Sequence, residues 1–269
     1  MKIQTFIIDA FTDQKFKGNP AGVCLVESVI STEVMQSIAS ELNLSETAFL
    51  MSTNDENTYN IRYFTPTVEV DFCGHASLAS AKMILDKKLV NRTEFTTENG
   101  LQIKATKEGA NIVMDFPLYA SQNTNVDQNL LEAFGIENFV EARFCEALDM
   151  LLIEVHSKAE LEQLNPDFSK AMQVADSIKE LVVTVKSEDN QFDFYSRCFC
   201  PWIGIDEDPV TGAAHTVLAK FWQEKLGKDA MIAYQLSKRG GYMELEIVDN
   251  HTLKVKSKAI IVFEGTIEL

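Results

Sequence analysis

Residues 64–85, FTPTVEVDFCGHASLASAKMIL, contain the feature that decides the fold. An extended acidic segment ends at Cys73-Gly74, and small residues then begin an apolar helix. The first turn of a helix leaves backbone N–H groups without an intrahelical partner, and the helix dipole adds partial positive charge there. Because Gly74 lets a ligand approach this backbone closely, the helix start is a candidate binding site for a carboxylate or a phosphate.

The chain contains a second stretch of the same design at residues 199–222, FCPWIGIDEDPVTGAAHTVLAKFW. Each copy runs through Phe-x-Pro, an acidic loop and a Gly, and then enters a helix of small and apolar residues. Such a repeat predicts duplicated units whose helix starts face one another across a cleft. Two alternatives remain open: the resemblance arises by chance, or Gly74 and Gly212 only allow close helix packing.

The composition narrows the function classes. The chain has 269 residues, 46% hydrophobic and 24% charged, and a formal charge of −16. This charge argues against a nucleic-acid or anionic-membrane surface, because both need a basic footprint; the alternative is a local basic patch hidden by the average. The sequence has no apolar run of about eighteen residues and no signal-peptide pattern at its start, so a cytoplasmic protein is expected.

Motifs for metals and nucleotide cofactors are missing from the sequence. The five Cys include no C-x-x-C pair, and the four His include no H-E-x-x-H pair. Neither a G-x-G-x-x-G nor a Walker A stretch occurs. We therefore expect no cofactor and no metal.

The periodicity predicts an α+β fold. Short strands with turn residues between them alternate with a few helices, and each half contains one central apolar helix. The polar stretch 121–129, SQNTNVDQN, is the best candidate for a linker. It follows the predicted boundary between an N-terminal half, 1–118, and a C-terminal half, 119–258.

Four residues are candidates for the chemistry. Cys73 lies where a helix dipole favours a thiolate, and His75 could donate a hydrogen bond to a carboxylate or move a proton. The alternatives without a chemical role are that Cys73 is a small buried residue and that His75 is a structural histidine. Asp208 could equally form an Asx-turn before Pro209, and composition alone would not select Glu46.

Four ordered motifs then resemble one family. They are IDAFTDQKFKGNPAGV, NLSETAFL, IRYFTPTVEVDFCGHASLASA and EDPVTGAAH. Together they resemble the PhzF family of phenazine biosynthesis-like proteins, which shares the diaminopimelate epimerase fold. The resemblance implies two pseudo-symmetric halves, each a mainly antiparallel barrel around a central helix, with the active site in the cleft between them. It also implies that the last strand, about 259–269, returns to the first half, and that the protein is a homodimer.

The resemblance assigns roles to individual residues. The family's best-understood enzyme isomerises a dihydro-hydroxyanthranilate by moving a proton between carbons, without a metal or an organic cofactor. Its catalytic groups match Glu46 as the acid/base, His75 as the supporting histidine and Asp208 as the second acidic residue. The expected substrate-binding residues are Ser45, Cys73, Gly74, Gly212 and Ala213, and the backbone at the two glycines would hold a substrate carboxylate.

This sequence also departs from the family pattern. Ala213 stands where a Ser is usual, and Cys73 stands where the phenazine enzyme has no thiol. The first hypothesis is therefore a cofactor-independent isomerase of a small carboxylate-bearing metabolite. An epimerase that uses Cys73 with Glu46 or Asp208 as the opposite base is the second. A protein that binds small acids without turnover is the third.

Overall fold

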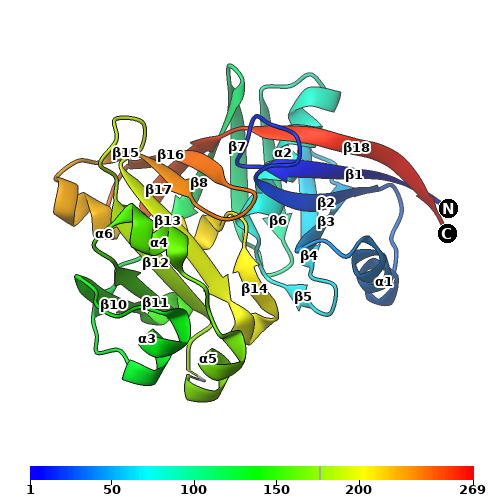
Figure 1. The fold of residues 1–269 in the computed structure, drawn as a ribbon. Helices are drawn as coiled ribbons and strands as arrows, with labels where there is room; N and C mark the ends of the chain where they lie inside the picture. The colour runs from blue at the N-terminus through cyan, green and yellow to red at the C-terminus, as the bar shows by residue number, and fades with distance from the viewer. Residues whose placement is uncertain (176) are drawn as a thin grey trace. The chain divides into compact units, whose positions relative to one another are not determined.

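The computed structural model describes residues 1–175 and 177–269, and the chain divides into two compact units. The first unit comprises Met1–Phe116 and Lys254–Leu269, and the second comprises Pro117–Leu253. Within the described residues, no helix has the length and apolar character needed to cross a membrane. Strands and a few helices are mixed in both units, which confirms the predicted α+β class (Figure 1).

The first unit is built from strands around one helix. Its elements are β1 (Lys2–Ala10), β2 (Asn19–Val26), α1 (Thr32–Leu42), β3 (Glu46–Ser52), β4 (Thr58–Phe64), β5 (Glu69–Val70), α2 (Gly74–Lys87), β6 (Arg92–Thr97), β7 (Gln102–Glu108), β8 (Asn111–Pro117) and β18 (Ala259–Glu268), while β17 (Thr252–Ser257) begins just before its second segment. Strand β18 pairs antiparallel with β1, so the two chain ends lie side by side (Figure 1).

Helix α2 is the centre of the first unit. It packs against β1, β2, β3, β6, β7 and β18. Ten of its fourteen residues are buried, including Ala76, Ala79 and Ala81, which are 0% exposed. Small side chains let the surrounding strands approach the helix closely, and that packing explains why most of the helix surface is formed by small or apolar residues.

The second unit repeats this plan. Its elements are β9 (Gln122–Asn123), α3 (Gln128–Phe134), β10 (Glu141–Cys145), the 3-10 turn η1 (Glu146–Leu148), β11 (Met150–Glu154), α4 (Lys158–Gln163), α5 (Phe168–Val174), β12 (Glu180–Lys186), β13 (Phe194–Cys200), the 3-10 turn η2 (Pro201–Ile203), β14 (Ile205–Asp208), α6 (Gly212–Leu226), β15 (Ala230–Gln235) and β16 (Gly241–Ile247). Helix α6 is buried along most of its length, with Phe221 and Trp222 at most 1% exposed.

Strand pairing shows the repeat in detail. In the first unit β3 lies parallel to β2 and antiparallel to β4, with Thr47 opposite Phe64. In the second unit β12 lies parallel to β11 and antiparallel to β13, with Leu181 opposite Phe199. The two Phe residues are those of the repeated Phe-x-Pro motif, so the same strand register precedes both central helices.

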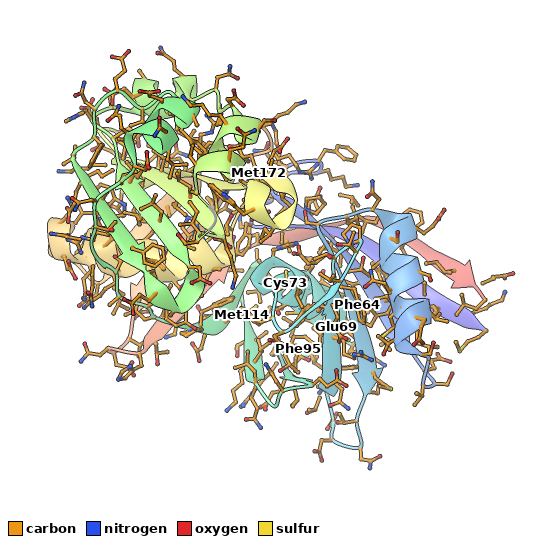
Figure 2. All side chains as sticks on the ribbon, turned by 90° about the horizontal axis from the view of Figure 1, so that it is seen from below. Phe64, Glu69, Cys73, Phe95, Met114 and Met172 are labelled. Carbon is orange, nitrogen blue, oxygen red and sulfur yellow. The ribbon has the colours of Figure 1, made fainter. Side chains whose placement is uncertain are left out.

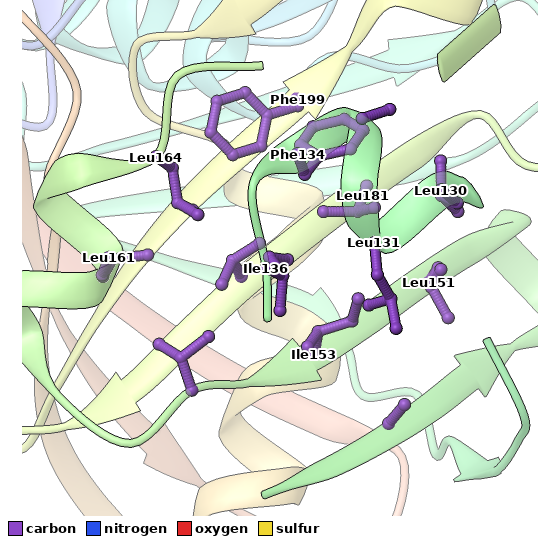
Figure 3. Close-up of a cluster of buried hydrophobic side chains, with 14 of the residues drawn as sticks. Leu130, Leu131, Phe134, Ile136, Leu151, Ile153, Leu161, Leu164, Leu181 and Phe199 are labelled. Carbon is purple, nitrogen blue, oxygen red and sulfur yellow. The ribbon is translucent and has the colours of Figure 1, made fainter. Parts of the chain in front are cut away.

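A large apolar cluster fills one side of the second unit (Figure 3). Leu181 and Phe199 are fully buried in it, and the Phe199 ring lies 5.3 Å from that of Phe134. Successive side chains of a strand point to opposite faces. The neighbours of Leu181 and Phe199 in sequence, Glu180 and Cys200, therefore point away from this cluster.

Candidate active site

Three of the predicted residues meet in the first unit, at the start of α2. Cys73, labelled in Figure 2, is the N-cap of α2. His75 is the second residue of this helix, and Glu46 begins β3. His75 Nε2 lies 3.2 Å from Glu46 Oε2, and the side chains of His75 and Glu46 are 7% and 15% exposed. Cys73 Sγ lies 3.3 Å from His75 Nδ1. The structure thus brings Glu46, Cys73 and His75 together.

The local sequence explains how β3 presents Glu46. Helix α1 ends at Asn43, which adopts a left-handed conformation, and Ser45 follows in a bend just before β3. Strand β3 then lies against β2, where a Cβ on Gly22 would meet Thr47 Oγ1 at 2.6 Å. Because Gly22 has no side chain, the two strands can approach closely here, beside Glu46.

Asn19 decides which nitrogen of His75 carries the proton. The Asn19 amide nitrogen lies 3.3 Å from His75 Nδ1, and an amide nitrogen can only donate. Nδ1 therefore accepts, and the proton of the neutral ring resides on Nε2. From Nε2 the ring donates to the Glu46 carboxylate, so Asn19, His75 and Glu46 form one directed chain of hydrogen bonds.

Burial keeps His75 neutral. It lowers the pKa of His75 to about 3, because an imidazolium would lose its hydration inside the protein. A second buried histidine, His215 in α6, has its pKa lowered by burial to about 4, although its Nδ1 donates to Thr211 O at 2.7 Å. Near neutral pH His75 is thus a hydrogen-bond donor to Glu46 and carries no charge.

The neutral histidines predict a pH dependence of stability. Below pH about 6.5 the unfolded chain binds protons on His75 and His215 that the folded chain does not bind. The free energy of unfolding therefore falls as the pH drops from about 6.5 to about 4, by about 1.4 kcal/mol per pH unit for each histidine. The free energy of unfolding, measured with urea at several pH values in this range, should change less steeply with pH in His75→Gln and in His215→Gln than in the wild type.

The pH dependence of stability also contains a contribution from Glu180, and the measurement needs a control histidine. Glu180 contributes with the opposite sign, because burial and then the nearby Asp208 carboxylate raise the pKa of Glu180 to about 7. The stability due to protonated Glu180 is lost as the pH rises through 7, so each variant is compared with the wild type. The exposed His156 is the matched control, because His156→Gln makes the same change outside the two buried sites. If the free energy of unfolding depended on pH equally in His75→Gln and His156→Gln, His75 would not be held neutral by burial.

The other predicted residues lie in the second unit, at the start of α6. Thr211 is the N-cap of this helix, Gly212 is its first residue, and the partly buried Ala213 follows. Asp208 is 8% exposed and accepts a hydrogen bond at 2.5 Å from the Thr211 hydroxyl. Gln235 donates to Asp208 O at 2.7 Å and accepts from Thr211 N at 2.8 Å. These contacts tie Asp208, the last residue of β14, to the N-cap of α6 and to Gln235.

The sequence reasoning missed one acidic residue, Glu180. It begins β12 as Glu46 begins β3, and each glutamate precedes the residue that pairs with the motif Phe. Aligning the sequences of β3 and β12, the strands that pair with the two strands carrying the motif Phe residues, would have shown Glu180 at the position of Glu46.

Either glutamate could contribute to a metal site. Glu46, Cys73 and His75 offer ligand atoms within 4.8 Å of one another, and so do Glu180, Cys198 and Cys200.

Comparisons with known proteins agree on one family. The profile of the PhzC-PhzF family, described as phenazine biosynthesis-like protein, matches residues 8–265. An uncharacterized isomerase of Halalkalibacterium halodurans is 43% identical over 251 residues, which cover 92% of each chain. The crystal structure of a PhzF-family phenazine biosynthesis protein from Enterococcus faecalis superposes with a TM-score of 0.91 at 33% identity, and the match covers 100% of both chains.

A more distant structure extends the fold likeness. A hydroxyproline epimerase from Agrobacterium vitis superposes with a TM-score of 0.59 at 11% identity, over 99% of this chain and 92% of the other. At this identity the likeness concerns the fold alone. Together these structures confirm the predicted diaminopimelate epimerase-like α+β fold.

Proposed function

The chain belongs to the PhzC-PhzF family of phenazine biosynthesis-like proteins and is an isomerase, and from this premise we propose that Glu46 moves a proton between two carbons of a small carboxylate-bearing metabolite. The observation that carries the proposal is the 3.2 Å contact between His75 Nε2 and Glu46 Oε2. A neutral histidine fixes one carboxylate oxygen by a hydrogen bond, so the other oxygen is oriented for proton transfer.

In the proposed reaction one carboxylate acts first as the base and then as the acid. Glu46 takes a proton from one carbon, the electron pair of that C–H bond moves into the conjugated system, and Glu46 becomes a carboxylic acid. It then returns the proton to a different carbon, and the double bond has shifted. A single group on one face of the substrate suits such an allylic shift. His75 supports both states, because its Nε2–H can donate to the ionised and to the protonated carboxyl group.

The substrate carboxylate is assigned to the start of α2. The N–H groups of the first turn lack intrahelical acceptors, and Gly74 has no side chain that would block their approach. Binding by peptide dipoles suits a protein with a net charge of −16 and few cationic side chains. The participation of Ser45, Asp208, Gly212 and Ala213 in the same reaction stays a prediction, as do the homodimer and the cytoplasmic location.

One observation favours a second candidate, an epimerase that uses Cys73. Its sulfur lies 3.3 Å from His75 Nδ1, so a base is within reach of the thiol. An epimerase inverts one stereocentre and needs acid and base groups on opposite faces of that carbon. The binding protein without turnover is set aside, because the chain is an isomerase.

Solvent deuterium separates the two reactions. We expect that incubation in D₂O with a panel of unsaturated and amino carboxylic acids labels a carbon other than the one that loses its proton. Cys73→Ala should retain turnover within about threefold, since a lost thiol contact leaves the Glu46 carboxylate in place. Mass spectrometry with fragment analysis locates the label. Label confined to one stereocentre, together with a loss of about 100-fold or more in Cys73→Ala, would instead support the epimerase.

A further inference from the structure

A second cluster of ligand-type side chains lies in the second unit, where β12 begins and β13 ends. Cys198 Sγ is 3.7 Å from Cys200 Sγ and 3.7 Å from Glu180 Oε2. The two Cys side chains are at most 2% exposed, whereas Glu180 is partly exposed. The proposed reaction uses none of these three side chains.

The strand register builds this cluster. Cys198 lies opposite Val182 and Phe199 opposite Leu181, so one further step brings Glu180 next to Cys200. Residues two apart on a strand share a face, which directs both thiols to the same side. The pairing of β13 with β14 is irregular between Cys198 and Cys200, at the point where the strand enters the turn η2. The three ligand atoms therefore converge because of backbone geometry.

We propose that Cys198, Cys200 and Glu180 form a binding site for a thiophilic divalent cation of the zinc class. In tetrahedral zinc sites the Zn–S bond is about 2.3 Å and the Zn–O bond about 2.0 Å. Two sulfur ligands of one tetrahedron are then about 3.8 Å apart, and a sulfur and an oxygen about 3.5 Å. The two observed separations of 3.7 Å lie close to these edges, and all three ligand atoms lie within 4.8 Å of one another, so side-chain adjustment alone could bring them onto one cation.

A divalent cation would have to displace protons from this cluster. The neighbouring Cys200 thiol, and then burial, raise the pKa of Cys198 well above its ordinary value, so the Cys198 thiol keeps its proton while no cation is bound. A thiol must lose its proton to coordinate a metal, so binding would be accompanied by proton release. The fourth position of the tetrahedron would hold water or another small ligand.

Cobalt(II) is the best probe, because thiolate ligands give its complexes intense near-ultraviolet charge-transfer bands. We expect that the full-length protein, kept reduced, develops these bands with one equivalent of Co²⁺, and that Zn²⁺ abolishes them. The bands should persist in Cys73→Ala, which disables the thiol of the other cluster, and in Cys145→Ser, a matched buried thiol of the same unit. They should disappear in the double variant Cys198→Ser/Cys200→Ser.

Two further measurements keep the proposal testable if the double variant does not fold. Glu180→Gln should weaken Zn²⁺ binding by at least about 10-fold in calorimetric titration, because one ligand becomes a neutral amide. Titrations of the wild type in buffers of different ionisation enthalpy should show the release of about two protons above pH 8. The proposal is overturned if the wild type shows no thiolate bands, or if Cys73→Ala removes them. It is equally overturned if Glu180→Gln binds Zn²⁺ as tightly as the wild type.

Discussion

Glu46→Gln is expected to lower the rate of proton transfer by about 10³-fold, within the range of about 10² to 10⁴ that general acid–base catalysis provides. The amide preserves the size and planarity of the side chain, and its oxygen can still accept the hydrogen bond from His75 Nε2. What the variant loses is the ability to take up and return a proton. We therefore expect a fall in kcat with little change in KM or in the free energy of unfolding.

The rate of deuterium incorporation into an accepted substrate measures this effect directly. Glu27→Gln is the matched control, because Glu27 is an exposed carboxylate of the same unit, directly after β2. It should exchange deuterium at the wild-type rate. If Glu46→Gln retained more than a tenth of the wild-type rate, another group would have to be the acid/base. Cys73 and His75 would then be the next candidates, because both lie at the same helix start.

The sequence predicted the central helices well, for a physical reason. Burial on most sides selects small and apolar residues over the first three turns of α2 and α6, and that signal does not depend on the rest of the fold. Strand β15 was not predicted, because its sequence shows no alternation of polar and apolar residues. Gln235 is fully buried and accepts from Thr211 N, whereas Ile232 is exposed. Helix α5 was also missed, because its seven residues bury only Ala171.

The site was less accessible to sequence reasoning. The contact between Glu46 and His75 joins residues 29 positions apart, and it exists only because β3 packs against α2. Sequence periodicity predicts which helix or strand contains each residue, but it does not predict which residues of different elements are in contact. The family resemblance was therefore needed to select Glu46. The role of Asn19 in setting the tautomer of His75 depends on a side-chain contact over a still longer range. No local pattern encodes that contact.

Gly18→Ala is expected to destabilise the first unit by about 3 kcal/mol, because two costs combine. Gly18 has a φ of +65°, and a Cβ at this position would meet the backbone oxygen of Ala10 at 2.0 Å. A backbone atom cannot move aside as a flexible side chain can, so the turn itself must shift. The next residue is Asn19, whose amide nitrogen contacts His75 Nδ1. The displacement should therefore lower the rate of proton transfer as well as the stability.

Gly109→Ala is the matched control for the steric part of this effect. Gly109 has nearly the same backbone conformation, with a φ of +63°, but a Cβ there would meet nothing within 4 Å. Only the cost of the left-handed conformation applies, about 1 to 2 kcal/mol. Urea unfolding of both variants isolates the clash at Gly18 as the difference between the two losses. If both variants lost the same free energy of unfolding, the turn at Gly18 could accommodate a Cβ without cost. The position of Asn19 would then depend on its own packing and not on the glycine before it.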